Sequence, residues 1–183
     1  AVLALEPARP EAELGGVESR HQFRFPPDLR VCLAAAHPVG EGFPNWRTGV
    51  RTHRGGDGAP ITSSLADVLS WPTDGIVFDV EQNGLWRPEF GDQPVDPADR
   101  RATATTYLRS LPRLIPVYSH RYLPEQPSTP GNPVFSVWQS DVIYYGSDLR
   151  DYLAREFNSA PRAPIRVPPW RRIPFWSELA EGS

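Results

Sequence analysis

The stretch from residue 112 to residue 157 constrains the fold most, because its apolar side chains change from the spacing of strands to the spacing of a helix. Three short runs rich in β-forming residues lie at positions 114–118, 134–138 and 142–145, with Gly, Pro, Asn, Asp and Ser between them. In residues 147–157 the apolar side chains recur at intervals of three and four. The stretch therefore predicts three neighbouring strands of one sheet, followed by a helix.

The segments before this stretch predict mainly helices. Helices are expected, in chain order, at residues 11–14, from 27 or 28 to 36, at 61–69 and at 97–110. The third is expected to end before Trp71 and Pro72, because a proline disfavours helical backbone in the residue before it. Residues 75–80 are typical of a strand, since their large apolar side chains alternate along the chain.

Prolines shape the rest of the chain. There are 22 prolines in 183 residues, more than twice the usual share of ~5%, so many turns and extended connections are expected. Residues 40–60 predict a long connection or a loosely paired hairpin. A Pro-rich linker after residue 158 leads to large apolar side chains, and we expect residues 172–179 to pack back on the body. This divides the chain into an α+β domain at 1–158 and a Pro-, Arg- and Trp-rich extension at 159–183.

Charge and hydropathy argue against several classes of function. The formal net charge is −3, so no overall basic field is available to hold nucleic acid or an anionic membrane. Arginines and aromatic residues are interleaved at 170–176, as in proteins that bind single strands, but anchoring of the extension is the favoured interpretation. No apolar run approaches the ~18 residues of a membrane span, and no signal-peptide pattern opens the chain. The single Cys32 is expected to be a buried, inert thiol, which favours a reducing, cytoplasmic location.

Four segments of the chain, in their serial order, resemble the SUKH superfamily. They are FPPDLRVCLAA at residues 25–35, FDVEQNGLW at 78–86, LIPVYSHRYLP at 114–124 and NPVFSVWQSDVIYYGSDLRDYL at 132–153. The resemblance covers most of the chain. It implies an α+β fold in which N-terminal helices precede a mostly antiparallel, twisted sheet with further helices packed on one side.

The resemblance also implies a function in binding. Many bacterial members of that superfamily are immunity proteins that bind and neutralise a toxin, often a secreted nuclease, and fungal members are hubs of protein interaction. The superfamily supplies no catalytic set to transfer to this sequence and implies no cofactor. The expected partner is therefore a protein, plausibly a nuclease-type toxin.

An enzymatic alternative would depend on His120. A histidine beside a carboxylate can serve as a general base, and carboxylates are available in the sequence at Asp79, Glu81, Glu125 and Asp141. Such a site would suit a small-molecule hydrolase or transferase. The favoured interpretation is that His120 satisfies backbone groups at the end of a strand, so no catalytic residue is predicted. An interaction protein with a housekeeping role is a further alternative.

Metal ligation finds little support in the sequence. The four histidines show no paired spacing within a helix, and one cysteine cannot supply a thiolate cluster. Residues 79–84 place oxygen-bearing side chains at alternate positions before a glycine, as in calcium loops. They lack the length and closing Glu of such a loop. A turn with Asn83 and Gly84 at its positive-φ positions is the favoured interpretation, and neither a metal nor a cofactor is predicted.

Protein binding uses more features of the sequence than any other function. Tyr, Trp and Arg dominate the energetics of protein interfaces, and this chain holds 6 Trp and 6 Tyr beside many arginines. The residues predicted to form the binding surface, on an open face of the sheet, are Trp86, His120, Arg121, Tyr122, Trp138, Tyr144 and Tyr145. We also expect Phe135, Trp138 and Tyr152 to be largely buried.

Overall fold

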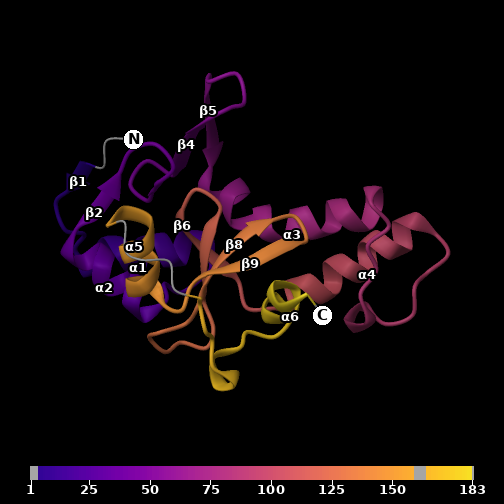
Figure 1. Cartoon of the computed structure of the whole chain (residues 1–183). Coiled ribbons are helices and arrows are strands. Elements are labelled where there is room, and N and C mark those ends of the chain that lie inside the picture. Colours follow the sequence, from indigo (N-terminus) through magenta and orange to yellow (C-terminus); the bar gives the residue numbers. More distant parts are fainter. Residues whose placement is uncertain (1–3, 159–163, 183) are drawn as a thin grey trace.

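The computed structural model describes residues 4–158 and 164–182 (Figure 1). Its strands are β1 (Ala4–Glu6), β2 (His37–Val39), β3 (Pro44–Asn45), β4 (Val50–Arg54), β5 (Pro60–Ser64), β6 (Leu114–Tyr118), β7 (Arg121–Pro124), β8 (Val134–Trp138) and β9 (Asp141–Gly146). Its α-helices are α1 (Glu11–His21), α2 (Pro27–Ala35), α3 (Leu65–Gln82), α4 (Pro97–Arg109), α5 (Leu149–Phe157) and α6 (Trp176–Glu181). The α+β class and the antiparallel pairing are confirmed. No described helix is long and apolar enough to cross a bilayer.

The four strands β6 to β9 form the central antiparallel sheet, in the order of the chain. The predicted runs at 114–118, 134–138 and 142–145 are all strands of this sheet. The expectation that they are immediate neighbours is wrong for the first two, because β7 lies between β6 and β8. This strand has only four residues and begins and ends with Arg121 and Pro124, so it lacks the apolar run that marks the others.

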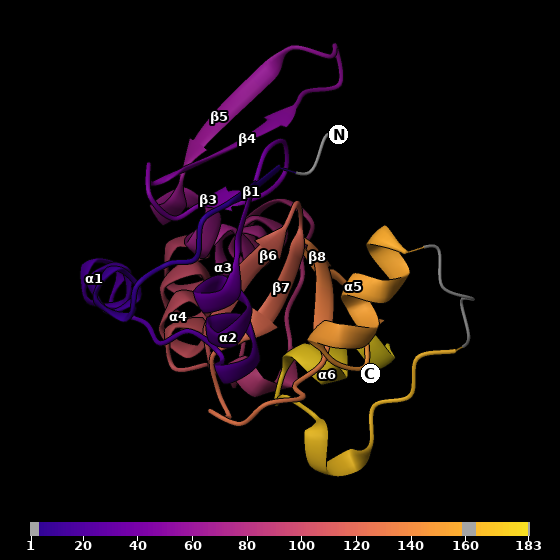
Figure 2. The same cartoon turned by 90° about the vertical axis from the view of Figure 1, so that its left-hand side faces the viewer.

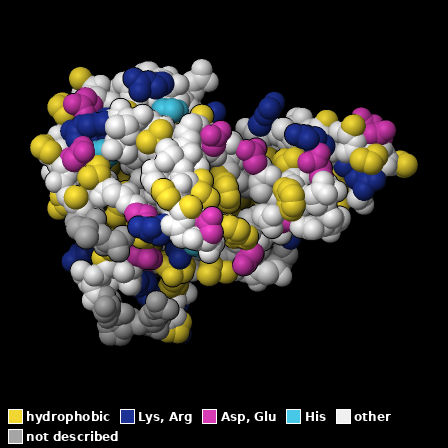
Figure 3. All heavy atoms as spheres, turned by 90° about the horizontal axis from the view of Figure 1, so that it is seen from above, with side chains coloured by type: hydrophobic (Ala, Val, Ile, Leu, Met, Phe, Trp, Pro, Cys, Tyr) yellow, Lys and Arg dark blue, Asp and Glu magenta, His cyan; other side chains and the backbone are white. Residues whose placement is uncertain are grey.

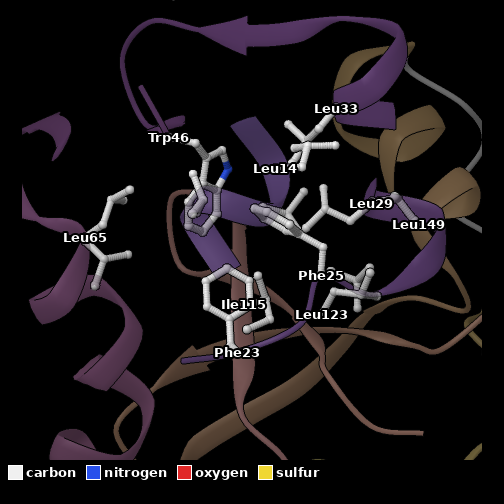
Figure 4. Packing of buried hydrophobic residues seen from close by; sticks show 14 of the residues in the cluster. Leu14, Phe23, Phe25, Leu29, Leu33, Trp46, Leu65, Ile115, Leu123 and Leu149 are labelled. Atoms are coloured by element: carbon white, nitrogen blue, oxygen red, sulfur yellow. The ribbon is translucent and has the colours of Figure 1, made fainter. Parts of the chain in front are cut away.

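Helices cover both faces of the central sheet, which corrects the expectation that they pack on one side. Neighbouring residues of a strand point to opposite faces, and Tyr122 and Leu123 accordingly belong to two different hydrophobic clusters. The first cluster joins one face to α1, α2, the start of α3 and α5 (Figure 4). The second joins the other face to the rest of α3, α4 and α6. The sheet is thus the middle layer of the molecule.

The two N-terminal helices differ from their sequence-based predictions in detail. Helix α1 continues to His21, well beyond the predicted 11–14, and buries Leu14 and Val17. Helix α2 is where the sequence predicts it, but the expectation that Cys32 is buried is wrong, because its thiol is exposed. The buried side of this helix is formed by Leu29 and Leu33.

Strands β3, β4 and β5 form a separate antiparallel sheet, which agrees with a hairpin in the 40–60 connection. The hairpin of β4 and β5 extends away from the rest of the molecule (Figures 1 and 2). The prediction of a helix at 61–69 is wrong for its first half, since residues up to Ser64 pair with β4. Only at Ser64, whose side chain accepts a hydrogen bond from the Asp67 backbone N–H, does α3 begin.

Helix α3 passes through the segments that were expected to contain a helix end and a strand. It continues beyond Trp71, contains Pro72, and includes all of residues 75–80. Its apolar residues contact partners on several sides, among them the sheet and α4. A helix with apolar residues on most of its sides lacks the single apolar stripe that identifies an amphipathic helix. Large apolar side chains can then alternate along part of its sequence, as they do here at 75–80, and so resemble those of a strand.

The remaining helices agree with the sequence. Helix α4 is capped by Asp96 and α5 by Asp148, each through its carboxylate. In the extension, Ile173, Phe175 and Trp176 are buried in the second cluster, so the prediction that this part packs back on the body is confirmed. The predicted division after residue 158 lies at the edge of the described residues and stays a prediction.

Candidate binding surface

The residues predicted to form one binding surface lie at four separate places. Trp86 is in the connection between α3 and α4, where its indole Nε1 donates to the backbone oxygen of Gly91 at 2.9 Å. Its ring packs edge-on against Phe90, 5.3 Å away between centroids. Trp86 therefore supports the α3–α4 connection and has no ring contact with the other predicted residues in the described structure.

Tyr122 and Tyr144 point into the second hydrophobic cluster. Tyr122 is fully buried, so its assignment to a binding surface is wrong. Burial raises the pKa of its phenol to about 12. Tyr144 is half-buried. Its ring packs on Phe135, and its hydroxyl donates to the carboxylate of Glu181 at 3.0 Å. Both tyrosines hold the sheet to the elements that cover this face.

Arg121 and Tyr145 lie together on the opposite face of the sheet. The guanidinium carbon of Arg121 is 3.7 Å from the centroid of the Tyr145 ring. The Nη1 group of Arg121 also donates to the hydroxyl of Ser136 at 3.0 Å. Arg121 is only 9% exposed, so this cation–π pair is a rigid support beneath the surface.

An exposed apolar surface forms at the corner where β8 ends and β9 begins. Its residues are Trp71, His120, Trp138 and Ile143, which we call the aromatic surface. The ring centroids of Trp71 and Trp138 are 5.7 Å apart, and those of His120 and Trp138 are 6.2 Å apart. Trp138 is 56% exposed and Ile143 47%. Ile143 lies opposite Ser136, two residues from Trp138 on the same face.

The expectation that Trp138 is buried is wrong for a positional reason. It is the last residue of β8, at the rim of the sheet, where its ring contacts Trp71 and His120 and is otherwise left largely exposed. Trp71 was missed as a site residue because its proline neighbour indicated the end of a helix. Ile143 was missed because it lies within an apolar run that reads as core. Its place in the edge strand β9 emerges only from the pairing order.

Among the described residues, the side chain of His120 contacts a hydroxyl and makes no hydrogen bond to a carboxylate. Its Nδ1 lies 3.1 Å from the hydroxyl of Ser119. Burial, together with the charges of Arg121 and Arg51, lowers the pKa of His120 to about 4. None of the described hydrogen bonds joins His120 to a carboxylate. A neutral imidazole beside two guanidinium groups is suited to its edge-on packing against Trp138 rather than to accepting a proton.

Three of the four carboxylates proposed as partners of His120 have structural roles elsewhere, and the fourth, Asp141, is exposed at the start of β9, opposite Trp138. Asp79 is buried in α3 and accepts from the backbone N–H of Ser140, at 2.8 Å, and from the side-chain amide of Asn83. Glu81 pairs with Arg101, and Glu125 accepts from the backbone of Arg24. Asp79 thereby fastens the β8–β9 turn to α3.

The calcium alternative does not fit the geometry of residues 79–84. Asp79 and Glu81 lie in the last turns of α3, which ends at Gln82, and Gly84 has a φ of 70°. The segment is thus a helix end followed by Gly84 with positive φ, and the expectation of a positive φ at Asn83 is wrong, because its φ is −112°. Within the described parts of the chain, no group of three His, Cys, Asp or Glu side chains is close enough to share a metal ion.

The fold and this surface define an α+β protein with an exposed pair of tryptophans, Trp71 from α3 and Trp138 from the end of β8. Comparison of the chain with protein family models, with curated proteins and with solved structures finds no match.

Proposed function

We propose that this chain is a non-catalytic protein-binding module that occludes its partner with the aromatic surface. The observation that carries the proposal is the pair of Trp71 and Trp138, residues that are 37% and 56% exposed and lie beside the exposed Ile143. Clustered exposed aromatic groups are costly in water and are typical of interaction sites. Tryptophan is also the residue most enriched at the energetic centres of interfaces.

The aromatic surface stands on a rigid frame. The turn after Trp138 is held by the Asp79 carboxylate, and Gly75 of α3 packs so closely on Gln139 that a β-carbon would lie 2.9 Å from its Cα. Arg121 is fixed from below by Tyr145 and Ser136. A surface that is already ordered loses little entropy on binding, which favours affinity.

The proposed partner is a protein of the nuclease-toxin type, bound in the cytoplasm. The serial resemblance to the SUKH superfamily supports this choice, and a net charge of −3 favours approach to a basic, nucleic-acid-binding protein. Acidic and basic side chains are interspersed on the face seen in Figure 3, with hydrophobic side chains between them. Such a surface favours recognition by shape and apolar contact, with a weak contribution from charge.

A photo-crosslinking amino acid placed at Trp138 tests the proposal. The control carries the same amino acid at Val95, which is 94% exposed but lies in the α3–α4 connection. We expect position 138 to crosslink to one protein in the cell that position 95 does not. That protein, purified, should bind the Trp138→Ala variant about tenfold or more weakly than the wild type, as expected for a hot spot. Equal crosslinking from both positions, or equal affinity of the purified partner for Trp138→Ala, would overturn the proposal.

A further inference from the structure

A groove of about 770 Å³ lies on the side of α3 away from the aromatic surface. Four separate parts of the chain form its walls, namely the C-terminal end of α1, one side of α3, α4 with the residues that connect it to β6, and Trp176 at the start of α6. Helices α3 and α4 pack side by side (Figure 1), and residues of both line the groove. The groove is therefore a feature of the assembled fold, and it has the size of a ligand site.

The groove side of α3 is a continuous stripe of one helix face. Ala66, Leu69, Thr73 and Val77 line it at intervals of three and four residues. Trp71 is turned to a different side of the helix, because each residue advances by about 100° around the axis. Eleven steps separate Ala66 from Val77, which corresponds to a groove about 16 Å long at 1.5 Å per residue.

The charges that line the groove are almost all positive. Four arginines line it, Arg20, Arg101, Arg109 and Arg113, against the single carboxylate of Asp74. The whole chain, by contrast, carries a net charge of −3. This concentration of guanidinium groups in an acidic protein favours an anionic ligand at this position.

Two of these arginines are fixed and two are available. Arg113 donates to the backbone oxygen of His21 at 2.8 Å, and Arg101 pairs with Glu81 at 2.9 Å. Arg20 and Arg109 are exposed, and neither makes an ion pair with any residue in the described ranges 4–158 and 164–182. Both stand in the last turn of a helix, at the two sides of the groove.

The lining between the arginines is partly apolar and partly polar. Ala66 is exposed and Leu69 and Leu111 are half-buried, so these three offer apolar surface, while Ser70, Thr73 and Thr105 add polar groups. A nucleic acid strand would bring mainly phosphates and polar edges to this lining and would bury little apolar surface of its own. A helix with apolar residues on one side and carboxylates beside them matches both the lining and the charged rim.

We propose that the groove between α1, α3 and α4 binds an acidic amphipathic helix of a protein partner. The apolar side of that helix lies on Ala66, Leu69 and Leu111, which are exposed or half-buried, and its carboxylates pair with Arg20 and Arg109. About three helical turns fill the 16 Å of the groove. This site is separate from the aromatic surface and shares with the proposed function only the premise that the partner is a protein.

A synthetic peptide tests this site directly. The probe is a fluorescently labelled peptide of about 14 residues, long enough for three to four turns, with Leu at helical spacing and Glu on the flanking positions. Its matched control has Gln in place of every Glu. By fluorescence anisotropy we expect the Glu peptide to bind the full chain about tenfold more tightly than the Gln peptide, with an affinity that falls as salt is raised.

Two double variants locate the binding. Arg20→Gln with Arg109→Gln should weaken the Glu peptide about tenfold and leave the Gln peptide unchanged. The control is Arg150→Gln with Arg166→Gln, which removes two exposed arginines away from the groove and should change neither affinity. Trp138→Ala should also bind the Glu peptide as the wild type does, so failure of the aromatic surface and failure of the groove are distinguishable. No binding of the Glu peptide, equal loss in both double variants, or tighter binding of a single-stranded oligonucleotide at Arg20 and Arg109 would overturn the inference.

Discussion

The hydroxyl of Tyr122 in β7 donates a hydrogen bond to the backbone oxygen of Val68 in α3, at 3.2 Å. In a regular helix that oxygen would accept from the N–H of the residue four positions later. That residue is Pro72, which has no N–H to donate. The tyrosine from the middle of the sheet thus supplies the donor that the proline lacks, and this contact helps α3 to continue past a residue that normally ends a helix.

Removing this hydroxyl should destabilise the protein in a way that depends on Pro72. Tyr122→Phe leaves a buried carbonyl without a partner, and we expect the free energy of unfolding to fall by about 1–2 kcal/mol. In a Pro72→Ala background the alanine N–H can bond to Val68, so the same substitution should cost less than about 0.5 kcal/mol. Denaturant unfolding of the four proteins measures this coupling. Equal costs of Tyr122→Phe in the two backgrounds would show that the hydroxyl does not replace the proline's missing donor.

Gly75 should resist a substitution that usually stabilises helices. Gly→Ala within a helix normally raises the free energy of unfolding by about 0.5–1 kcal/mol. At Gly75 the added β-carbon would lie 2.9 Å from Cα of Gln139, so the β8–β9 turn must move, and we expect a net loss of about 1–3 kcal/mol. Gly16 of α1 has nothing within 4 Å of the same position, and Gly16→Ala is the matched control that should stabilise. If both variants gained stability, the close packing of α3 on the turn would be refuted.

The part of the fold that could be predicted from sequence is the part where local pattern and tertiary environment agree. Strands β6, β8 and β9 have apolar runs of their own, and α4 and α5 begin at side chains that cap them. Residues 61–64 instead become a strand because β4 pairs with them from a distance. The continuation of α3 through Pro72 depends in part on Tyr122, which lies 50 positions later. A contact between residues so far apart in the chain cannot be predicted from the local sequence pattern.

The candidate site was predictable to a similar extent. The sequence indicated seven residues on an open face of the sheet. Of these, His120 and Trp138 lie together in the aromatic surface, and Arg121 and Tyr145 form a separate pair. The sequence could not indicate Trp71, because this side chain reaches Trp138 only when α3 continues past Pro72. The error in α3 and the missing site residue therefore have one physical cause.

The stack of Arg121 on Tyr145 should contribute to stability through the aromatic ring itself. Tyr145→Phe keeps the ring beneath the guanidinium, and we expect the free energy of unfolding to change by less than about 0.5 kcal/mol. Tyr145→Leu removes the ring from a half-buried site and should cost about 1–2 kcal/mol. Chemical denaturation of the two variants compares them directly. A loss of similar size in both would mean that the phenol oxygen, rather than the ring, is what matters.

Stability should decline on mild acidification because of His120. Its pKa is about 4 in the folded protein and 6.5 ordinarily, so the unfolded chain binds the proton more tightly. The stabilisation is therefore complete above pH 6.5 and is lost as the pH falls from 6.5 towards 4. At 1.36 kcal/mol per pKa unit, and allowing for partial exposure of the ring, we expect a loss of about 2 kcal/mol by about pH 4.5. His120→Gln cannot take up the proton, so its unfolding free energy should fall by about 2 kcal/mol less over the same range. Denaturant unfolding of both proteins at a series of pH values measures this difference. The carboxylates contribute equally in the two proteins, so only His120 can make their unfolding free energies diverge. Parallel curves of unfolding free energy against pH would exclude His120 as the source of the acid-dependent loss.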